Sequence, residues 1–202
     1  LYFSSLFSLI TIYCTAKIYS SLKAIPAWNN PLVPIIYLLN AIIMGLIITY
    51  TILFYCEIIN ISLSNAIIIF SFTAIFIKLL YWYSIKIKSK SNIATATGLG
   101  TKEKTYFFEG PHTGKSFLTD EMINKINRSK SYLLRITFLI FTYITPAYYI
   151  YKLNSLVIND NIILITLIIL SIIAFVGMFI ERYLFFIESK HTVSLYYGNQ
   201  SI

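Results

Sequence analysis

The sequence is poor in charge. Only 12% of its 202 residues are Asp, Glu, Lys or Arg, whereas soluble domains carry roughly 25%. Hydrophobic residues make up 57% of the chain and the mean hydropathy is +0.74. A buried soluble core does not account for such a composition, because the apolar runs are nearly free of charge and roughly 20 residues long, which is the length that crosses a bilayer. The scarcity of charge therefore excludes a soluble globular domain.

Histidine and cysteine are equally scarce. The chain has two histidines, His112 and His191, and both lie in polar segments outside the apolar runs. Bis-histidine haem ligation between facing helices is therefore not expected. The two cysteines, Cys14 and Cys56, lie in different runs and form no CxxC spacing, so they supply neither a metal site nor an iron–sulfur site. We expect the chain itself to bind no cofactor.

What the sequence does contain is a series of apolar runs. They predict an all-α protein, a polytopic transmembrane helix bundle forming one integral membrane domain over residues 1–202, with Pro146 producing a kink in the fourth helix. The five predicted helices cover residues 1–16, 32–55, 65–85, 132–151 and 162–186.

Residues 86–131 form the one long polar stretch, a predicted extramembrane loop. It carries nine of the sixteen Lys and Arg residues and four of the eight acids. Thr119 could cap a short surface helix there. The stretch Gly110–Ser116 superficially resembles a phosphate-binding loop, but it has one residue too few between its glycines and Pro111 removes a backbone donor. We therefore expect a membrane-surface loop, on the cytoplasmic side by the distribution of cations.

The net charge of +8 also suits anionic headgroups or an acidic partner better than a nucleic acid. Inside the predicted spans, polar residues gather at one depth, near the side of the polar loop. Charges at this depth are costly and usually face a bundle interior. Arg135 and Glu181 could pair across the hairpin of the last two predicted helices. One interpretation of these residues is a pocket for a quinone headgroup. The other is that Lys78 and Arg135 extend to the membrane interface while Glu181 forms a structural ion pair. The candidate quinol-pocket residues are Asn40, Lys78, Tyr81, Trp82, Arg135, Glu181 and Arg182.

Three passages carry a resemblance to a known family: AKIYSSLKAIPAWNNPLVP, then IATATGLG with EGPHTGKSFLTDEM, and ERYLFFIESKHTVSLYYG. Together they resemble the membrane anchor subunit of dimethyl sulfoxide reductase, the DmsC type. The resemblance implies a haem-free anchor that oxidises menaquinol in anaerobic respiration and passes electrons to an iron–sulfur subunit and then to a molybdopterin subunit. Arg182 matches a family arginine near the end of the last helix.

The resemblance also implies eight helices in the bacterial inner membrane. The five predicted here would be the last five, in agreement with a chain that starts at Leu1 and is expected to be N-terminally truncated. The histidine and the acid that contact quinol in that family have no counterpart in these residues. Two other functions remain open, a multipass transporter and a structural anchor without quinol contact. Inverted repeats and broken helices would mark a transporter, and only Pro146 hints at a broken helix.

Overall fold

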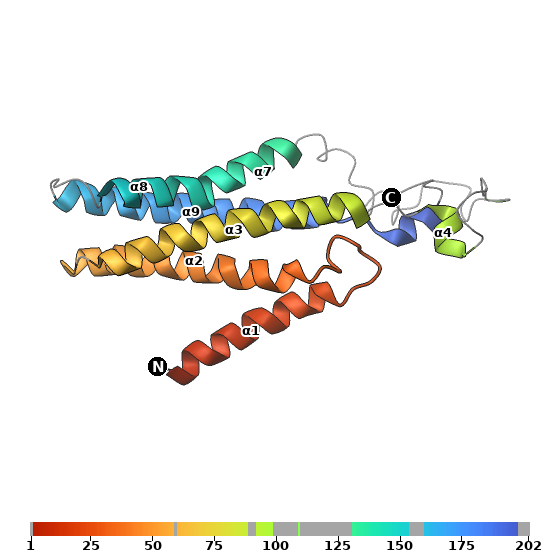
Figure 1. Ribbon diagram of the computed structural model, residues 1–202, viewed down its shortest axis with the longest axis horizontal. Helices are drawn as coiled ribbons and strands as arrows, with labels where there is room; N and C mark the ends of the chain where they lie inside the picture. Colours follow the sequence, from red (N-terminus) through yellow and green to blue (C-terminus); the bar gives the residue numbers. More distant parts are fainter. Residues whose placement is uncertain are drawn as a thin grey trace.

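The computed structural model describes residues 2–58, 60–88, 92–98, 109, 131–153 and 160–197. These residues are mostly helical and contain no strand, which confirms the predicted fold class (Figure 1). In chain order the elements are α1 (Tyr2–Ser20), α2 (Leu32–Tyr55), α3 (Ile61–Lys88), α4 (Ile93–Thr97), α7 (Ser131–Leu139), the π-helix η1 (Ile140–Ile144), α8 (Thr145–Leu153), α9 (Asp160–Ile187) and the 3₁₀-helix η2 (Thr192–Tyr197).

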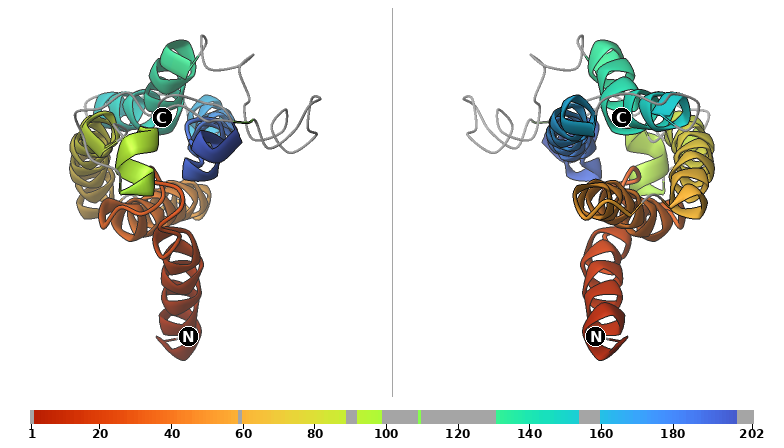
Figure 2. Two further views of the ribbon diagram at one scale, coloured as in Figure 1. Left: turned by 90° about the vertical axis from the view of Figure 1, so that its right-hand side faces the viewer. Right: turned by 90° about the vertical axis from the view of Figure 1, so that its left-hand side faces the viewer.

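Four long helical segments form the bundle. Helix α2, helix α3, the continuous segment α7–η1–α8 and helix α9 lie side by side, and end-on they occupy four corners (Figure 2). All four are long and apolar enough to cross a membrane. The second predicted run matches α2 residue for residue, whereas α3 extends the third run at both ends. Helix α1, formed by the first run, packs outside α2 and diverges from the bundle toward its N-terminus.

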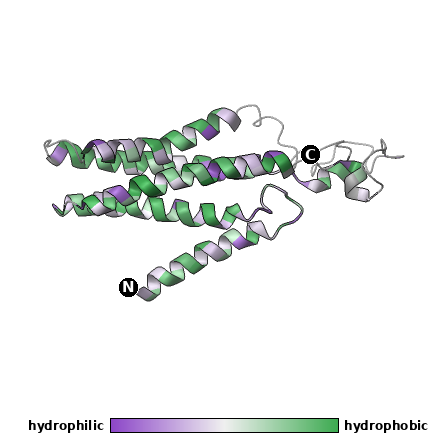
Figure 3. Ribbon diagram, in the orientation of Figure 1, coloured by the Kyte–Doolittle hydropathy of each residue, from purple (hydrophilic) through white to green (hydrophobic). Residues whose placement is uncertain are grey.

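The bundle helices are apolar on their outer faces as well as in the core. Ile43, Ile67 and Ala174 are fully buried between helices, whereas Phe72 and Phe179 are 68% and 63% exposed. Hydrophobic residues colour most of each bundle helix in Figure 3. A helix that is hydrophobic all round belongs either in a large core or in lipid. The described residues form one small bundle of four long segments, so the apolar outer faces suit contact with hydrocarbon.

At one end of the bundle, the link between α1 and α2 packs against α9. The Trp28 indole lies parallel to the Phe185 ring at 5.4 Å between centroids, and its Nε1 donates a hydrogen bond to the Phe185 carbonyl. Beyond α9, the backbone N–H and the hydroxyl of Thr192 both donate to the carbonyl of Ala24. This tie joins the segment after α9 to the link between α1 and α2.

The α-helical hydrogen bonding of the fourth span is interrupted just before Pro146, where the sequence predicts a kink. Pro146 lacks a backbone N–H, so a regular α-helix would leave the carbonyl of Thr142 without its partner. The chain instead forms the π-turn η1 immediately before Pro146, in which the N–H of Thr145 bonds to the carbonyl of Ile140. Segments α7 and α8 meet at an angle there (Figure 1). The predicted surface helix near Thr119 lies outside the described residues.

The π-turn packs closely against α9. A Cβ atom placed on Gly177 would lie 2.2 Å from Thr142 Oγ1 and 3.1 Å from the Thr142 backbone nitrogen. Such a separation is too short for a real contact, so only glycine permits this approach. Gly45, in the middle of α2, has no atom within 4 Å of the equivalent position.

These two glycines give a matched pair for a stability test. We expect Gly177→Ala to lower the melting temperature of the detergent-purified protein, because the methyl group would push η1 away from α9 and overpacking costs about 1–3 kcal/mol. Gly45→Ala should leave the melting temperature unchanged or raise it slightly, because alanine is the better helix former. Equal melting temperatures for the two variants would contradict the close approach of η1 to α9.

Candidate functional site

A buried ionic cluster joins α3 to α9. Lys78 and Glu181 are 2% and 0% exposed, and Lys78 Nζ lies 2.5 Å from Glu181 Oε1. The second carboxylate oxygen of Glu181 accepts a hydrogen bond from Arg182 Nε, also at 2.5 Å. Glu181 therefore lies between two cations, and only the side chain of Arg182 is partly exposed. Burying these charges unpaired would cost several kcal/mol each, so the contacts fix one helix against the other.

Aromatic rings surround the Lys78 ammonium group. Lys78 Nζ lies 4.8 Å from the centroid of Tyr81, 5.6 Å from that of Trp82 and 5.5 Å from that of Phe138. The first two rings follow from the sequence, because residues three and four positions apart share a helix face. A cation over an aromatic face is stabilised by the ring quadrupole, and more strongly where water is excluded. These rings therefore lower the cost of keeping the ammonium group buried.

The arginines extend the cluster toward the end of the bundle. The Arg182 guanidinium lies 3.8 Å from the centroid of Tyr37, on α2. Arg135 stacks over Trp82 at 4.9 Å, and its Nε lies 2.6 Å from Glu188 Oε1. The expected pairing of Arg135 with Glu181 is therefore wrong. Arg135 lies one turn into α7, which runs antiparallel to α9, so it meets the residue just beyond the end of α9 rather than the acid two turns earlier.

Asn40 connects to the cluster through a residue that the sequence does not single out. Its side-chain carbonyl accepts a hydrogen bond from the hydroxyl of Tyr143, in the π-turn. The Tyr143 ring packs edge-to-face on Phe138, which in turn lies against Lys78. Tyr143 stands in a run of aromatic and apolar residues, and no periodicity distinguishes it from the lipid-facing Tyr148. Only the π-turn directs it inward.

All seven candidate residues thus lie in one connected region, but the region is closely packed. The gap bordered by Tyr37, Lys78, Tyr81, Glu181 and Arg182 is too small to hold a water molecule. Receiving a quinone ring there would require these side chains to move apart. Four polar atoms of the candidate residues, Asn40 Nδ2, Tyr81 OH, Trp82 Nε1 and Arg182 Nη1, are buried without a hydrogen-bond partner. Within the described residues, no group of three or more His, Cys, Asp or Glu side chains could hold a metal ion.

The fold and this cluster define a class: a polytopic helical membrane protein whose bundle contains a paired, solvent-excluded charge. Comparison with known proteins adds one relative. The chain is similar to a subunit of the sulfite dehydrogenase of Allochromatium vinosum, with 27% identity over 199 residues that cover 94% of this chain. The match covers 57% of that relative, so the chain spans little more than half of the relative's length. No protein-family model and no solved structure matches the chain.

The ionic cluster predicts unequal effects of two similar substitutions. Glu181→Gln leaves the Lys78 cation buried without a counter-charge, and breaking a buried pair in this way costs about 3–5 kcal/mol. Glu188→Gln removes the partner of Arg135, which is partly exposed and can still reach the interface, so its effect should be much smaller. Unfolding of the purified variants in denaturing detergent measures both losses.

Adding Lys78→Met to Glu181→Gln removes the stranded cation, and we expect it to restore part of the lost stability. A double variant less stable than Glu181→Gln alone would show that the cost does not come from an unpaired charge.

Proposed function

We propose that this chain is the membrane subunit of an oxidoreductase complex of the bacterial cytoplasmic membrane, and that it oxidises menaquinol. Oxidation of one menaquinol to menaquinone releases two electrons and two protons. The electrons pass to an iron–sulfur subunit and then to a molybdopterin subunit, which reduces the terminal acceptor, and the protons go to water. The chain binds neither the clusters nor the molybdopterin; it supplies the contact between the membrane carrier and the soluble subunits.

The observation that carries this proposal is similarity along nearly the whole chain to a protein named as part of a dehydrogenase, in a chain whose four bundle segments can each span a membrane. A soluble redox enzyme needs a membrane partner when its electrons come from a lipid-soluble carrier. The passages that resemble the DmsC type support the choice of menaquinol and of an iron–sulfur subunit as the next electron carrier.

The two lines of support differ in the direction of electron flow. The DmsC resemblance implies that quinol is oxidised, whereas a dehydrogenase withdraws electrons from its own substrate. Our proposal is quinol oxidation. With the purified complex, reduction of the terminal acceptor by menaquinol should be faster than the reverse reaction, in which the reduced acceptor reduces menaquinone. A faster reverse reaction would show that the chain reduces quinone instead of oxidising quinol.

A structural anchor without quinol contact is the second candidate, favoured by the closed packing around Lys78 and Glu181. In that role the cluster would only hold α2, α3, α7 and α9 in register. Single substitutions in the cluster test whether its side chains take part in quinol oxidation. If Lys78→Met and Arg135→Gln assemble normally and leave the menaquinol kinetics unchanged, the cluster is structural.

Removal of this subunit tests the proposal directly. We expect the complex without it to lose menaquinol oxidation while it retains reduction of the terminal acceptor by a soluble dye, because the dye reaches the partner subunits without the membrane carrier. Steady-state rates with both donors measure the difference. Full menaquinol activity in a complex that lacks this chain would refute the proposal.

A further inference from the structure

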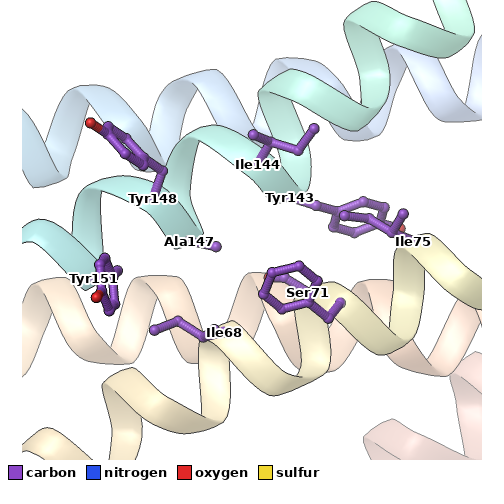
Figure 4. Close-up of a pocket in the computed structure, with 9 residues that line it drawn as sticks. Ile68, Ser71, Ile75, Tyr143, Ile144, Ala147, Tyr148 and Tyr151 are labelled. Atoms are coloured by element: carbon purple, nitrogen blue, oxygen red, sulfur yellow. The ribbon is translucent and has the colours of Figure 1, made fainter.

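A groove lies between α3 and the segment η1–α8, in the half of the bundle farther from the ionic cluster. Its volume is about 430 Å³, and Figure 4 shows side chains from both walls facing across it. The open side lies at the bundle surface, where Phe72, Tyr148 and Tyr151 are each more than 60% exposed. In a membrane this side meets hydrocarbon. The groove is lined by Ile68, Ser71, Phe72, Ile75, Tyr143, Ile144, Ala147, Tyr148 and Tyr151.

Ser71, on the α3 wall, is the unusual residue of this groove. It is 1% exposed, and its hydroxyl has no hydrogen-bond partner. Several other Ser and Thr hydroxyls of the long helices donate to a carbonyl three or four residues earlier: those of Thr51, Ser64, Thr73, Thr137, Thr166 and Ser171. The buried hydroxyl of Thr142, which does not line the groove, resembles that of Ser71 in having no partner. A buried hydroxyl without a partner is costly. The Ser71 side chain lines the groove, so rotation about its Cα–Cβ bond can turn this hydroxyl toward a molecule that enters the groove.

A second groove, between α2 and α9, provides the comparison. Its volume is about 290 Å³, and its walls are also apolar. Its two hydroxyls, on Thr51 and Ser171, lie 3.1 Å apart, and each is also within hydrogen-bond distance of a carbonyl of its own helix, so both protons have acceptors. Hydrocarbon chains suffice to fill such a groove. Of the two grooves, the one at Ser71 combines apolar walls with a hydroxyl that needs a partner.

The shape of the groove follows from its position beside the π-turn. Ser71 and Ala147 are small residues on opposite walls, so the helices leave space between them (Figure 4). Tyr143 lines the same space, but its hydroxyl already donates to Asn40, so of the two buried hydroxyls of the groove only that of Ser71 lacks a partner. π-turns within α-helices are frequent at functional sites, because they change the direction of side chains without ending the helix.

We propose that this groove binds the ring of a prenylated naphthoquinone, and that it is the site where the menaquinol of the proposed function is held. The inference rests on that function. Ligand pockets commonly measure about 300–1,000 Å³, so a bicyclic ring fits while its prenyl tail leaves through the open side into lipid. A serine hydroxyl both donates and accepts, so Ser71 can bond to the carbonyl of the quinone and to the hydroxyl of the quinol.

Binding of a radiolabelled short-chain menaquinone to the purified complex tests this site. We expect Ser71→Ala to raise the Kd about two- to tenfold, which corresponds to the loss of one hydrogen bond. Ala147→Leu fills the space opposite Ser71 and should raise the Kd by more than about tenfold. The control is Ser171→Ala in the second groove, which should leave the Kd unchanged. Melting temperature and dye-driven activity verify that each variant folds and assembles, and Ala147→Val replaces Ala147→Leu if the larger side chain prevents folding.

The outcomes separate this inference from the proposed function. If the wild-type complex oxidises menaquinol and the folded Ala147 and Ser71 variants bind menaquinone as tightly as wild type, the quinol site lies elsewhere and the inference is overturned. The same holds if excess phospholipid displaces the label as effectively as unlabelled menaquinone, because the groove is then a lipid-chain site. If the wild-type complex neither binds nor oxidises menaquinol, the proposed function itself fails.

Discussion

The contact between Lys78 and Glu181 is the constraint on which the bundle depends. Neither side chain can face hydrocarbon, and neither reaches water from its depth, so each must meet the other. That requirement fixes the height of α3 relative to α9. Apolar surfaces cannot set this height, because lipid tails solvate a leucine as well as another helix does. The surrounding rings stabilise the Lys78 cation, and Arg182, which bonds to the second carboxylate oxygen of Glu181, lies over Tyr37 of α2 in the same layer.

A second constraint, of pure shape, holds the fourth span against its neighbour α9. The π-turn before Pro146 fits against Gly177 of α9, and it turns Tyr143 toward Asn40. The same turn separates α8 from α3 enough to leave the groove at Ser71. An ion pair thus fixes α3 relative to α9, and close packing fixes the fourth span relative to α9. The groove lies between α3 and the fourth span.

The sequence predicts the spans better than the contacts between them. Apolar runs mark α2 residue for residue, and the spacing of Lys78, Tyr81 and Trp82 places all three on one face. The spacing of residues does not predict which acid pairs with Arg135. Glu181 and Glu188 both lie near the end of the same helix, and only the packing of the helices decides between them. Ser71 cannot be singled out from the sequence either. Its hydroxyl differs from several others in the spans because it does not bond to a carbonyl of its own helix. Pro146 indicates an interruption, but not that it takes the form of a π-turn.

The tie between the first link and the segment after α9 bears on how the chain matures during synthesis. Trp28 bonds to a carbonyl 157 residues later, and Ala24 accepts from a residue 168 positions away. The link between α1 and α2 therefore cannot reach its final conformation until the last span has left the ribosome and entered the bilayer. Until then the indole and the Ala24 carbonyl need other partners, which headgroups and interfacial water can supply. The segment after α9 thus completes the link between α1 and α2, and a nascent protein that stops short of α9 leaves that link open.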